Sequence, residues 1–395
     1  MKWTTKPLAE VAEFRLGKML DEKKNKGEPL PYLANINVRW GEFDLDNLRE
    51  MRFAHDEMNR YGLKYGDIVM CEGGEPGRCA IWKESVPGMM IQKALHRIRP
   101  HDGLDYRFLF YSLLHKGRIG SFVPLFTGST IKHLPREKLA KVEIVFPRLD
   151  VQCHIADILS GYDDLIENNR RRMALLEESS RLLYREWFVH LRFPGHEHTR
   201  ITDGVPEGWE RKSLGDLCSE IRESVSPENL EPDTPYIGLE HMPRRSISLN
   251  DWGKVEEVTS SKNRFKTREI LFGKIRPYFH KVGVAFVDGV ASSDTIVIRP
   301  MNEKLHGLVL MAVSSDEFVA VTAQQMKEGS KMPRADWKQM QSYCVPLPPS
   351  GLLSTFDGVI QPIISQLNAL TFANQKLRAA RDLLLPRLMS GDFAV

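Results

Sequence analysis

The chain has 395 residues, of which 42% are apolar and 27% charged, and its formal net charge is +3. At roughly 100–200 residues per domain, this length predicts two to four domains, and the composition excludes a chain that is disordered throughout. No apolar run approaches the roughly 20 residues of a membrane span, and Met1 to Pro7 lack the apolar core of an export signal. Five cysteines without a C-x-x-C pair indicate reduced thiols, so we expect a cytoplasmic protein.

The sequence repeats itself at an offset of about 201 residues. The matched segments, in chain order, are Trp3–Val11 with Trp209–Leu217, Pro31–Leu33 with Pro235–Ile237, Leu63–Val69 with Phe265–Leu271, Ile98–Pro100 with Ile298–Pro300, Gly128–Ser129 with Gly329–Ser330, and Pro135–Arg136 with Pro333–Arg334. Any one of these matches could arise by chance. Because they follow one another in the same order, the series predicts that the chain arose by duplication.

Each half combines short β-rich runs with short helical patterns. The β-rich runs, such as Asp67–Met70 and Thr295–Ile298, are separated by glycine and proline, and residues 106–114 form one helical pattern. The sequence therefore predicts two repeated domains of mixed α/β structure, an α+β fold. We place the first domain over residues 1–150, the second over 209–349, and a linker over 191–208.

A long helix is predicted after each domain, over residues 151–190 and 350–395. Apolar residues alternate at spacings of four and three in both segments, which is typical of a coiled-coil seam. The predicted seam comprises Ile155, Leu159, Tyr162, Ile166, Asn169, Met173, Leu176, Ser180, Leu183 and Trp187, and then Phe356, Ile360, Ile363, Leu367, Leu370, Asn374, Leu377, Arg381, Leu384 and Leu388. Two alternatives follow: the helices pair with each other, or each packs only on its own domain.

Connectivity favours an antiparallel pair, because a compact linker would place the start of the second helix beside the end of the first. The expected fold is then a long antiparallel two-helix coiled coil joining two repeated domains, with a pseudo-two-fold axis. Asn169 and Asn374 are polar seam residues of the kind that fix register. Gly358 and Pro362 are expected to delay or bend the second helix, and Pro386 to kink or end it.

Two related domains at the ends of a rigid rod suit the reading of two DNA half-sites, since half-site spacing mirrors protein symmetry. Divergent copies would read an asymmetric, bipartite target. Candidate DNA-binding residues lie in basic segments with glycine or aromatic neighbours; they are Arg78, Lys132, His133, Arg136, Lys274, Arg276, Lys281, Lys331 and Arg334. The alternative for each of them is an ordinary solvated charge. The low net charge indicates that other DNA-binding subunits assist.

Four segments carry a resemblance to a known family: Ile158–Arg172, Leu183–Val189, Arg192–His196 and Leu383–Gly391. They resemble the specificity subunits of type I restriction-modification systems, the HsdS family, and Gly128–Leu134 resembles the target-recognition domains of that family. The resemblance implies that each domain reads half of a bipartite sequence and that the helices act as a ruler. It also implies that methylation subunits (HsdM-like, two of them) dock on the helices along the seam segments, and that restriction subunits (HsdR-like) join this core.

The motifs of intrinsic catalysis do not occur in the sequence. There is no phosphate-binding G-x-x-x-x-G-K-[ST], no H-E-x-x-H, and no cofactor loop of a methyltransferase. His190, His196 and His198 lie close together but do not form a recognisable metal-binding motif, so we expect no metal site there. We therefore expect a chain without catalytic residues, metal or cofactor, whose partners carry S-adenosylmethionine, ATP and magnesium. The alternatives are a coiled-coil assembly adaptor that does not read DNA, and a nuclease or methyltransferase that acts alone.

Overall fold

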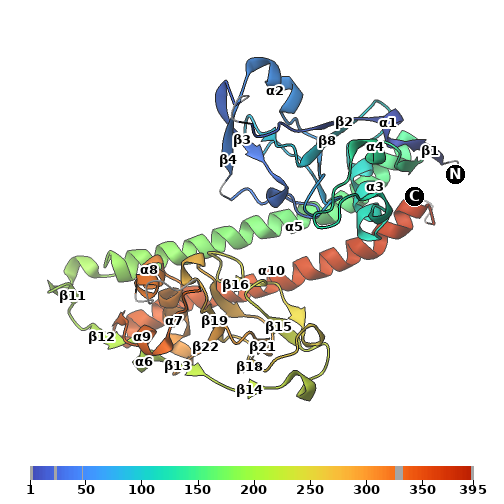
Figure 1. Cartoon of the computed structure of the whole chain (residues 1–395). Helices are drawn as coiled ribbons and strands as arrows, with labels where there is room; N and C mark the ends of the chain where they lie inside the picture. The colour runs from blue at the N-terminus through green and yellow to red at the C-terminus, as the bar shows by residue number, and fades with distance from the viewer. Residues whose placement is uncertain (1–2, 22–24, 47, 325–331, 393–395) are drawn as a thin grey trace. The chain divides into compact units, whose positions relative to one another are not determined.

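The computed structural model describes residues 3–21, 25–46, 48–324 and 332–392 (Figure 1). The chain divides into two compact units: unit 1 is Met1–Ile166 with Lys376–Val395, and unit 2 is Glu167–Gln375. Two long helices, α5 (Leu149–Tyr184) and α10 (Ser350–Ser390), run without a break across the unit boundary. Each unit therefore contains one globular domain and one segment of each long helix.

The domain of unit 1 is built on two small sheets. The larger has four antiparallel strands in the order β2 (Ala12–Leu16), β8 (Leu95–Pro100), β5 (Ile68–Cys71) and β6 (Cys79–Ile81). The smaller has the order β4 (Arg49–Phe53), β3 (Glu28–Leu33) and β7 (Met90–Ile91), and β1 (Thr4–Pro7) pairs with β9 (Glu143–Phe146). Helix α3 (Tyr106–Arg118) begins at Asp105, whose carboxylate accepts bonds from two backbone amides of its first turn. Its apolar face completes the core.

The domain of unit 2 repeats this plan. Its first sheet has the order β13 (Cys218–Ile221), β22 (Thr295–Pro300), β19 (Ile270–Gly273), β20 (Val282–Ala285) and β16 (Ser248–Leu249). Its second has the order β14 (Ser224–Val225), β18 (Lys262–Phe265), β21 (Gly289–Ala291), β15 (Pro235–Ile237) and β17 (Gly253–Lys254), and β12 (Glu210–Ser213) pairs with β23 (Cys344–Leu347). Helices α7 (His306–Val313) and α8 (Asp316–Gln324) cover the core.

The duplication is visible at matched residues of the two central sheets. Ile68 lies opposite Ile98 in one sheet, and Ile270 lies opposite Ile298 in the other. A buried acid beside each of these strands pairs with an arginine on its neighbour: Asp67 with Arg99 at 2.7 and 2.8 Å, and Glu269 with Arg299. Both carboxylates also accept a bond from a backbone amide three residues earlier, at 2.7 and 2.9 Å. The repeat inferred from the sequence therefore includes the same buried ion pair.

Within unit 1, the first turns of α5 share one core with the last turns of α10. Ile155 and Leu159 are buried together with Leu385 and Leu388. Polar contacts flank this core, where Asp163 accepts bonds from Tyr111 at 2.7 Å and from Arg381. The amino-terminal part of α5 therefore packs against both its own domain and the carboxyl-terminal part of α10.

Within unit 2, the contacts run in the opposite sense along α10. Asn169 donates to Asn374 at 2.9 Å, and further along α5 the ring of Trp187 lies 5.7 Å from that of Phe356. As α5 advances from Asn169 to Trp187, its partner recedes by the same number of residues on α10. The two helix segments of this unit are antiparallel. Every predicted seam side chain of both helices is buried or half-buried.

Helix α10 is less interrupted than the sequence predicts. It begins at Ser350 and continues through Gly358, Pro362 and Pro386 to Ser390, so the expected delay and the expected end at Pro386 are both wrong. Proline frees the carbonyl four residues earlier, which here belongs to Gly358 or Asp382. Both of those residues and both prolines are exposed, so water can satisfy the freed carbonyls. Helix α5 ends in a π-helical turn over Arg185–Val189.

Among the described helices, none is by itself long and apolar enough to cross a membrane, although one bent pair, Glu303–Val313 with Asp316–Gln324, meets the criteria of length and composition.

The pair Asn169–Asn374 is expected to act as a register marker. The offset of about 201 residues relates Asn169 to Leu370 and Asn374 to Met173, so the equivalent pair is apolar. Replacing Asn374, which is 5% exposed, with Ala leaves the Asn169 amide without its partner and is expected to cost about 1–3 kcal/mol. Replacing both asparagines with Leu is expected to be near neutral or stabilising. A double-mutant cycle from urea unfolding measures the difference, and strict additivity would contradict the contact.

Candidate nucleic-acid interface

The first-domain loop at Thr127–His133 folds back on itself. Thr127 and His133 exchange two backbone hydrogen bonds of 2.9 and 2.8 Å. Gly128 has φ +88°, and a Cβ there would lie 2.2 Å from the carbonyl oxygen of Ile131. The tip exposes Ile131 and Lys132, and the Lys132 amine bonds to the carbonyl of Gly128 at 3.0 Å. The loop thus presents a cation next to an exposed apolar side chain.

This loop is fixed against the segment that follows strand β5. The amide of Leu134 donates to the carbonyl of Glu72 at 2.7 Å, and His133 Nδ1 lies 3.0 Å from a carboxylate oxygen of Glu72. His133 is therefore half-buried and tied to an acid, while Arg136 is exposed with its guanidinium 5.4 Å from the centre of the Phe14 ring. Lys132 and Arg136 are the cations that this segment offers to solvent.

Arg78 is not placed as the sequence analysis expects. Its side chain is buried, with 8% of the residue exposed. The guanidinium donates to the carbonyl of Asn35 at 3.2 Å and pairs with Glu75 at 3.0 Å. A guanidinium engaged in this way anchors the loop from within and does not reach a DNA groove. The basic residue was identified by its neighbours in sequence, which do not report burial.

The second domain builds an equivalent loop pair from different residues. The amide of Ala335 donates to the carbonyl of Lys274 at 2.9 Å, and the amide of Arg276 donates to that of Pro333 at 3.0 Å. Arg334 is exposed and pairs with Asp294 at 3.1 Å. Candidates from two separate sequence segments, Lys274 with Arg276 and Arg334, are therefore adjacent. Lys331 lies outside the described residues.

The two lysines of this loop pair are less available than the arginines. The amine of Lys281 donates to the carbonyl of Leu239 at 2.5 Å, and its burial lowers its pKa. The amine of Lys274 donates to the carbonyl of Ser293 at 3.3 Å. Each ammonium group keeps further N–H donors, but its carbonyl contact restricts where a phosphate could meet it.

Two further exposed side chains, Arg244 and Tyr278, lie beside Arg276 and Phe279 and are not among the residues predicted from the sequence. The guanidinium of Arg244 lies 4.2 Å from the centre of the Phe279 ring, and that of Arg276 lies 5.8 Å from the same ring. Tyr278 is 53% exposed beside them. The aromatic pair adjoining Arg276 was a usable signal for Tyr278. Arg244 lies in a segment without a match in the first half, so neither the repeat nor the local pattern pointed to it.

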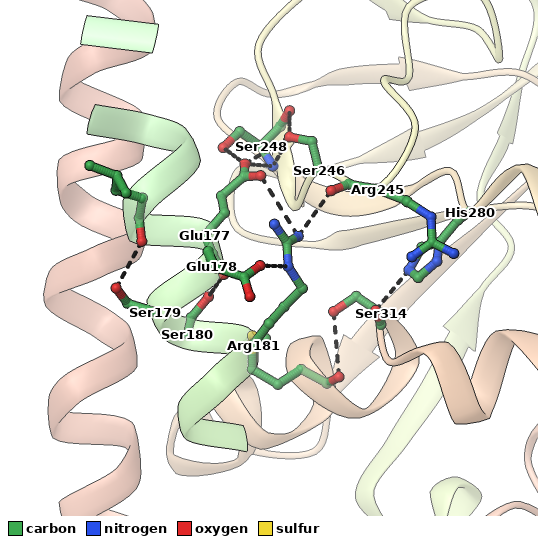
Figure 2. A network of polar contacts seen from close by, with 12 residues as sticks. Glu177, Glu178, Ser179, Ser180, Arg181, Arg245, Ser246, Ser248, His280 and Ser314 are labelled. Atoms are coloured by element: carbon green, nitrogen blue, oxygen red, sulfur yellow. Dashed lines mark hydrogen bonds and ion pairs between the residues drawn. The ribbon is translucent and has the colours of Figure 1, made fainter. Parts of the chain in front are cut away.

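The segment that carries Arg244 is fastened to α5 by buried polar contacts (Figure 2). Glu177 Oε1 accepts bonds from the hydroxyls of Ser246 and Ser248, at 2.7 and 2.5 Å, and from the Ser248 amide at 3.1 Å. Arg181 donates to the carbonyl of Arg245 at 2.9 Å. Burial raises the pKa of the Glu177 carboxyl, against the lowering effect of these donors.

Comparisons with known proteins show which family the chain belongs to. A family model described as "Type I restriction modification DNA specificity domain" matches the chain twice, over residues 1–178 and 206–379. The MjaIX specificity subunit of a type I restriction enzyme of Methanocaldococcus jannaschii is 23% identical, covering all of this chain and 94% of that protein. The EcoDI specificity subunit of Escherichia coli is 23% identical over 61% of this chain and 59% of that protein.

A solved structure supports the fold. The crystal structure of the type I restriction-modification S subunit from M. genitalium aligns with a TM-score of 0.55 at 17% identity, covering 98% of this chain and 96% of that one. A specificity subunit is the non-catalytic member of such a system, so the prediction that this chain is not an enzyme is confirmed by its family. With the family model matching most of its length in two copies, the chain belongs to the family of type I restriction-modification DNA specificity subunits.

Proposed function

We propose that each domain of this chain reads one half of an asymmetric, bipartite DNA sequence, and that the antiparallel helix pair sets the distance between the halves. The observation that carries this proposal is the repeated loop pair. In both domains a backbone bond joins the equivalent segments, from Leu134 to Glu72 and from Ala335 to Lys274. The frame is the same, whereas the exposed cations on it differ. Equal frames with unequal side chains suit the reading of two different half-sites.

The long helices suit the role of a ruler. Both α5 and α10 pass from one unit to the other without a break, and each unit contains its own contacts between them. A rod of paired helices resists bending better than a loop linker, so the spacing of two half-sites on DNA would be narrowly defined. Half-sites on one face of B-DNA recur every 10–10.5 base pairs, about 34–36 Å, and a rigid spacer would select one such separation.

Methylation subunits, two of HsdM type, are proposed to dock on the outer face of the helices, and restriction subunits of HsdR type to join them. The predicted seam residues are buried or half-buried within the chain, so exposed side chains on the same helices would add to the docking surface. Leu175 and Leu182 on α5 are 68% and 46% exposed, and Val189, in the π-helical turn that follows α5, is 43% exposed; the three follow one another at heptad spacing. The partners would supply S-adenosylmethionine, ATP and magnesium chemistry in the cytoplasm, while this chain selects the sequence.

A mobility-shift assay on the complex with methylation subunits tests the DNA-reading role. Charge reversal of Lys132 to Glu is expected to weaken binding to the cognate duplex about 10-fold or more, because it places a negative charge beside the phosphates. Lys6→Glu, at an exposed lysine of strand β1, is the matched control and should leave the affinity unchanged. If the chain were an assembly adaptor that does not contact DNA, both variants would bind with equal affinity. Binding by the unaltered complex without sequence preference would refute the proposal.

A further inference from the structure

We propose that Arg244 and Tyr278 read bases in the half-site of the second domain, with Phe279 as the platform that fixes the plane of the Arg244 guanidinium. The inference rests on the proposed DNA-reading function and names side chains that determine its specificity. Its basis is one cluster in unit 2, formed by Arg244, Arg276, Tyr278 and Phe279.

Among the residues that the structure describes, Arg244 and its cluster neighbour Arg276 have no acidic partner, and both guanidinium groups lie over the Phe279 ring. Arg244 is exposed, and its guanidinium lies over the Phe279 ring. Its neighbour Arg245 pairs with Asp316 at 2.8 Å, and Arg222 pairs with Glu220 at 2.7 Å. An exposed guanidinium that is stacked but not ion-paired keeps all its donors available to a ligand.

The platform is held in an unusual backbone conformation. The turn Pro277–Phe279 lies between two residues in the left-handed region, Arg276 at φ 49° and His280 at φ 54°. A non-glycine residue pays about 1–2 kcal/mol for this conformation, which persists only where the surroundings impose it. Here the His280 ring contacts the carbonyl of Ser314 at 2.8 Å, and the Arg276 amide donates to Pro333. The turn therefore keeps the Tyr278 ring in solvent.

The segment that carries Arg244 is anchored both to the turn Pro277–Phe279 and to helix α5. The amide of Arg245 donates to the carbonyl of His280 at 2.9 Å, which joins the Arg244 segment to the turn. The carbonyl of Arg245 accepts from Arg181 on α5, and Glu177 holds the two serines that follow (Figure 2). The position of the Arg244 side chain is thus defined relative to the helix segment of its own unit.

This geometry favours base reading over phosphate binding. A phosphate can be met by any mobile cation, but the O6 and N7 acceptors of guanine require a planar fork at a fixed angle. Stacking on Phe279 supplies such an angle for Arg244. The exposed Tyr278 ring offers an apolar surface for a neighbouring base pair, such as a thymine methyl group. Base contacts specify sequence, whereas phosphate contacts only position the protein.

Mapping of the methylated motif tests the inference on the complete complex with its methylation subunits. Arg244→Ala is expected to relax one base-pair position of one half-site, lowering the preference for the cognate base about 10- to 100-fold, while the other half-site is unchanged. Arg244→Lys keeps the charge without the fork and should relax the same position. Tyr278→Ala should relax an adjacent position, and Tyr278→Phe should not. Arg222→Ala, at an exposed and paired arginine, is the control.

The outcomes separate the inference from the function on which it rests. Uniformly weaker methylation with an unchanged motif would make Arg244 a phosphate contact and overturn the inference, leaving the proposed function intact. A wild-type complex without a bipartite motif would instead refute the proposed function. Thermal unfolding of each variant identifies loss of folding, and if Arg244→Ala unfolds, the motif read by Arg244→Lys decides the question.

Discussion

Replacement of Leu367 with Asp is expected to unfold unit 2 and to abolish its assembly with methylation subunits. Leu367 is fully buried in a core that also contains Met173, Ile364 and Leu370. An aspartate there loses the packing of a leucine and must either bury an unpaired charge or take up a proton. The expected cost is about 4 kcal/mol or more, a large part of the stability of a domain. Circular dichroism during heating measures it.

The matched control for this variant is Leu175→Asp. Leu175 is 68% exposed on α5, so the change should alter the free energy of unfolding by about 0.5 kcal/mol or less. If the methylation subunits dock at Leu175 as proposed, Leu175→Asp should nevertheless weaken their binding. Ile166→Asp, at the matched buried position of α5 in unit 1 (3% exposed), should destabilise unit 1 for the same reason. A Leu367→Asp chain with an unchanged unfolding midpoint would contradict the pairing of the helices.

The features that the sequence predicts well are those carried by regular spacing. The heptad positions from Ile155 to Trp187 and from Phe356 to Leu388 are all buried or half-buried, because a helix with apolar residues at these intervals can bury them only on one face. The internal repeat can also be predicted from the sequence. Its matched segments include Asp67 and Arg99 together with Glu269 and Arg299, and their ion pairs recur in both domains.

The features that the sequence predicts poorly depend on contacts between distant segments. Arg78 resembles a surface cation in sequence, but its burial depends on the loop of Asn35 folding over it. Pro386 would be expected to end the helix if the carbonyl that it frees, that of Asp382, were buried. Asp382 is in fact exposed, and its exposure cannot be predicted from its neighbours along the chain. Arg244 contacts Phe279, which lies 35 residues later in the sequence, and no local sequence pattern predicts that contact. Recognition surfaces are therefore the least predictable part of such a chain.

Removal of Arg99 is expected to destabilise unit 1 strongly, because it takes the guanidinium away from a buried carboxylate at the central sheet. Asp67 is 1% exposed and receives two bonds from Arg99, at 2.7 and 2.8 Å. Arg99→Ala leaves this carboxylate buried with the Lys64 amide as a remaining donor at 2.7 Å, and breaking a buried pair from one side costs about 3–5 kcal/mol. Arg299→Ala should cost less, because Arg299 is 44% exposed against 33% for Arg99.

Arg15→Ala supplies the control on the adjacent strand β2. Arg15 pairs with Glu13 at 2.6 Å, but its side chain is 51% exposed, so its loss should cost no more than about 1 kcal/mol. The double variant Asp67→Asn with Arg99→Ala should be more stable than Arg99→Ala alone, since the amide can still accept from Lys64 without burying a charge. Urea unfolding of the wild type, Asp67→Asn, Arg99→Ala and the double variant gives the coupling energy of the pair. Equal costs for Arg99→Ala and Arg15→Ala would show that the duplicated pair contributes no more than a surface contact.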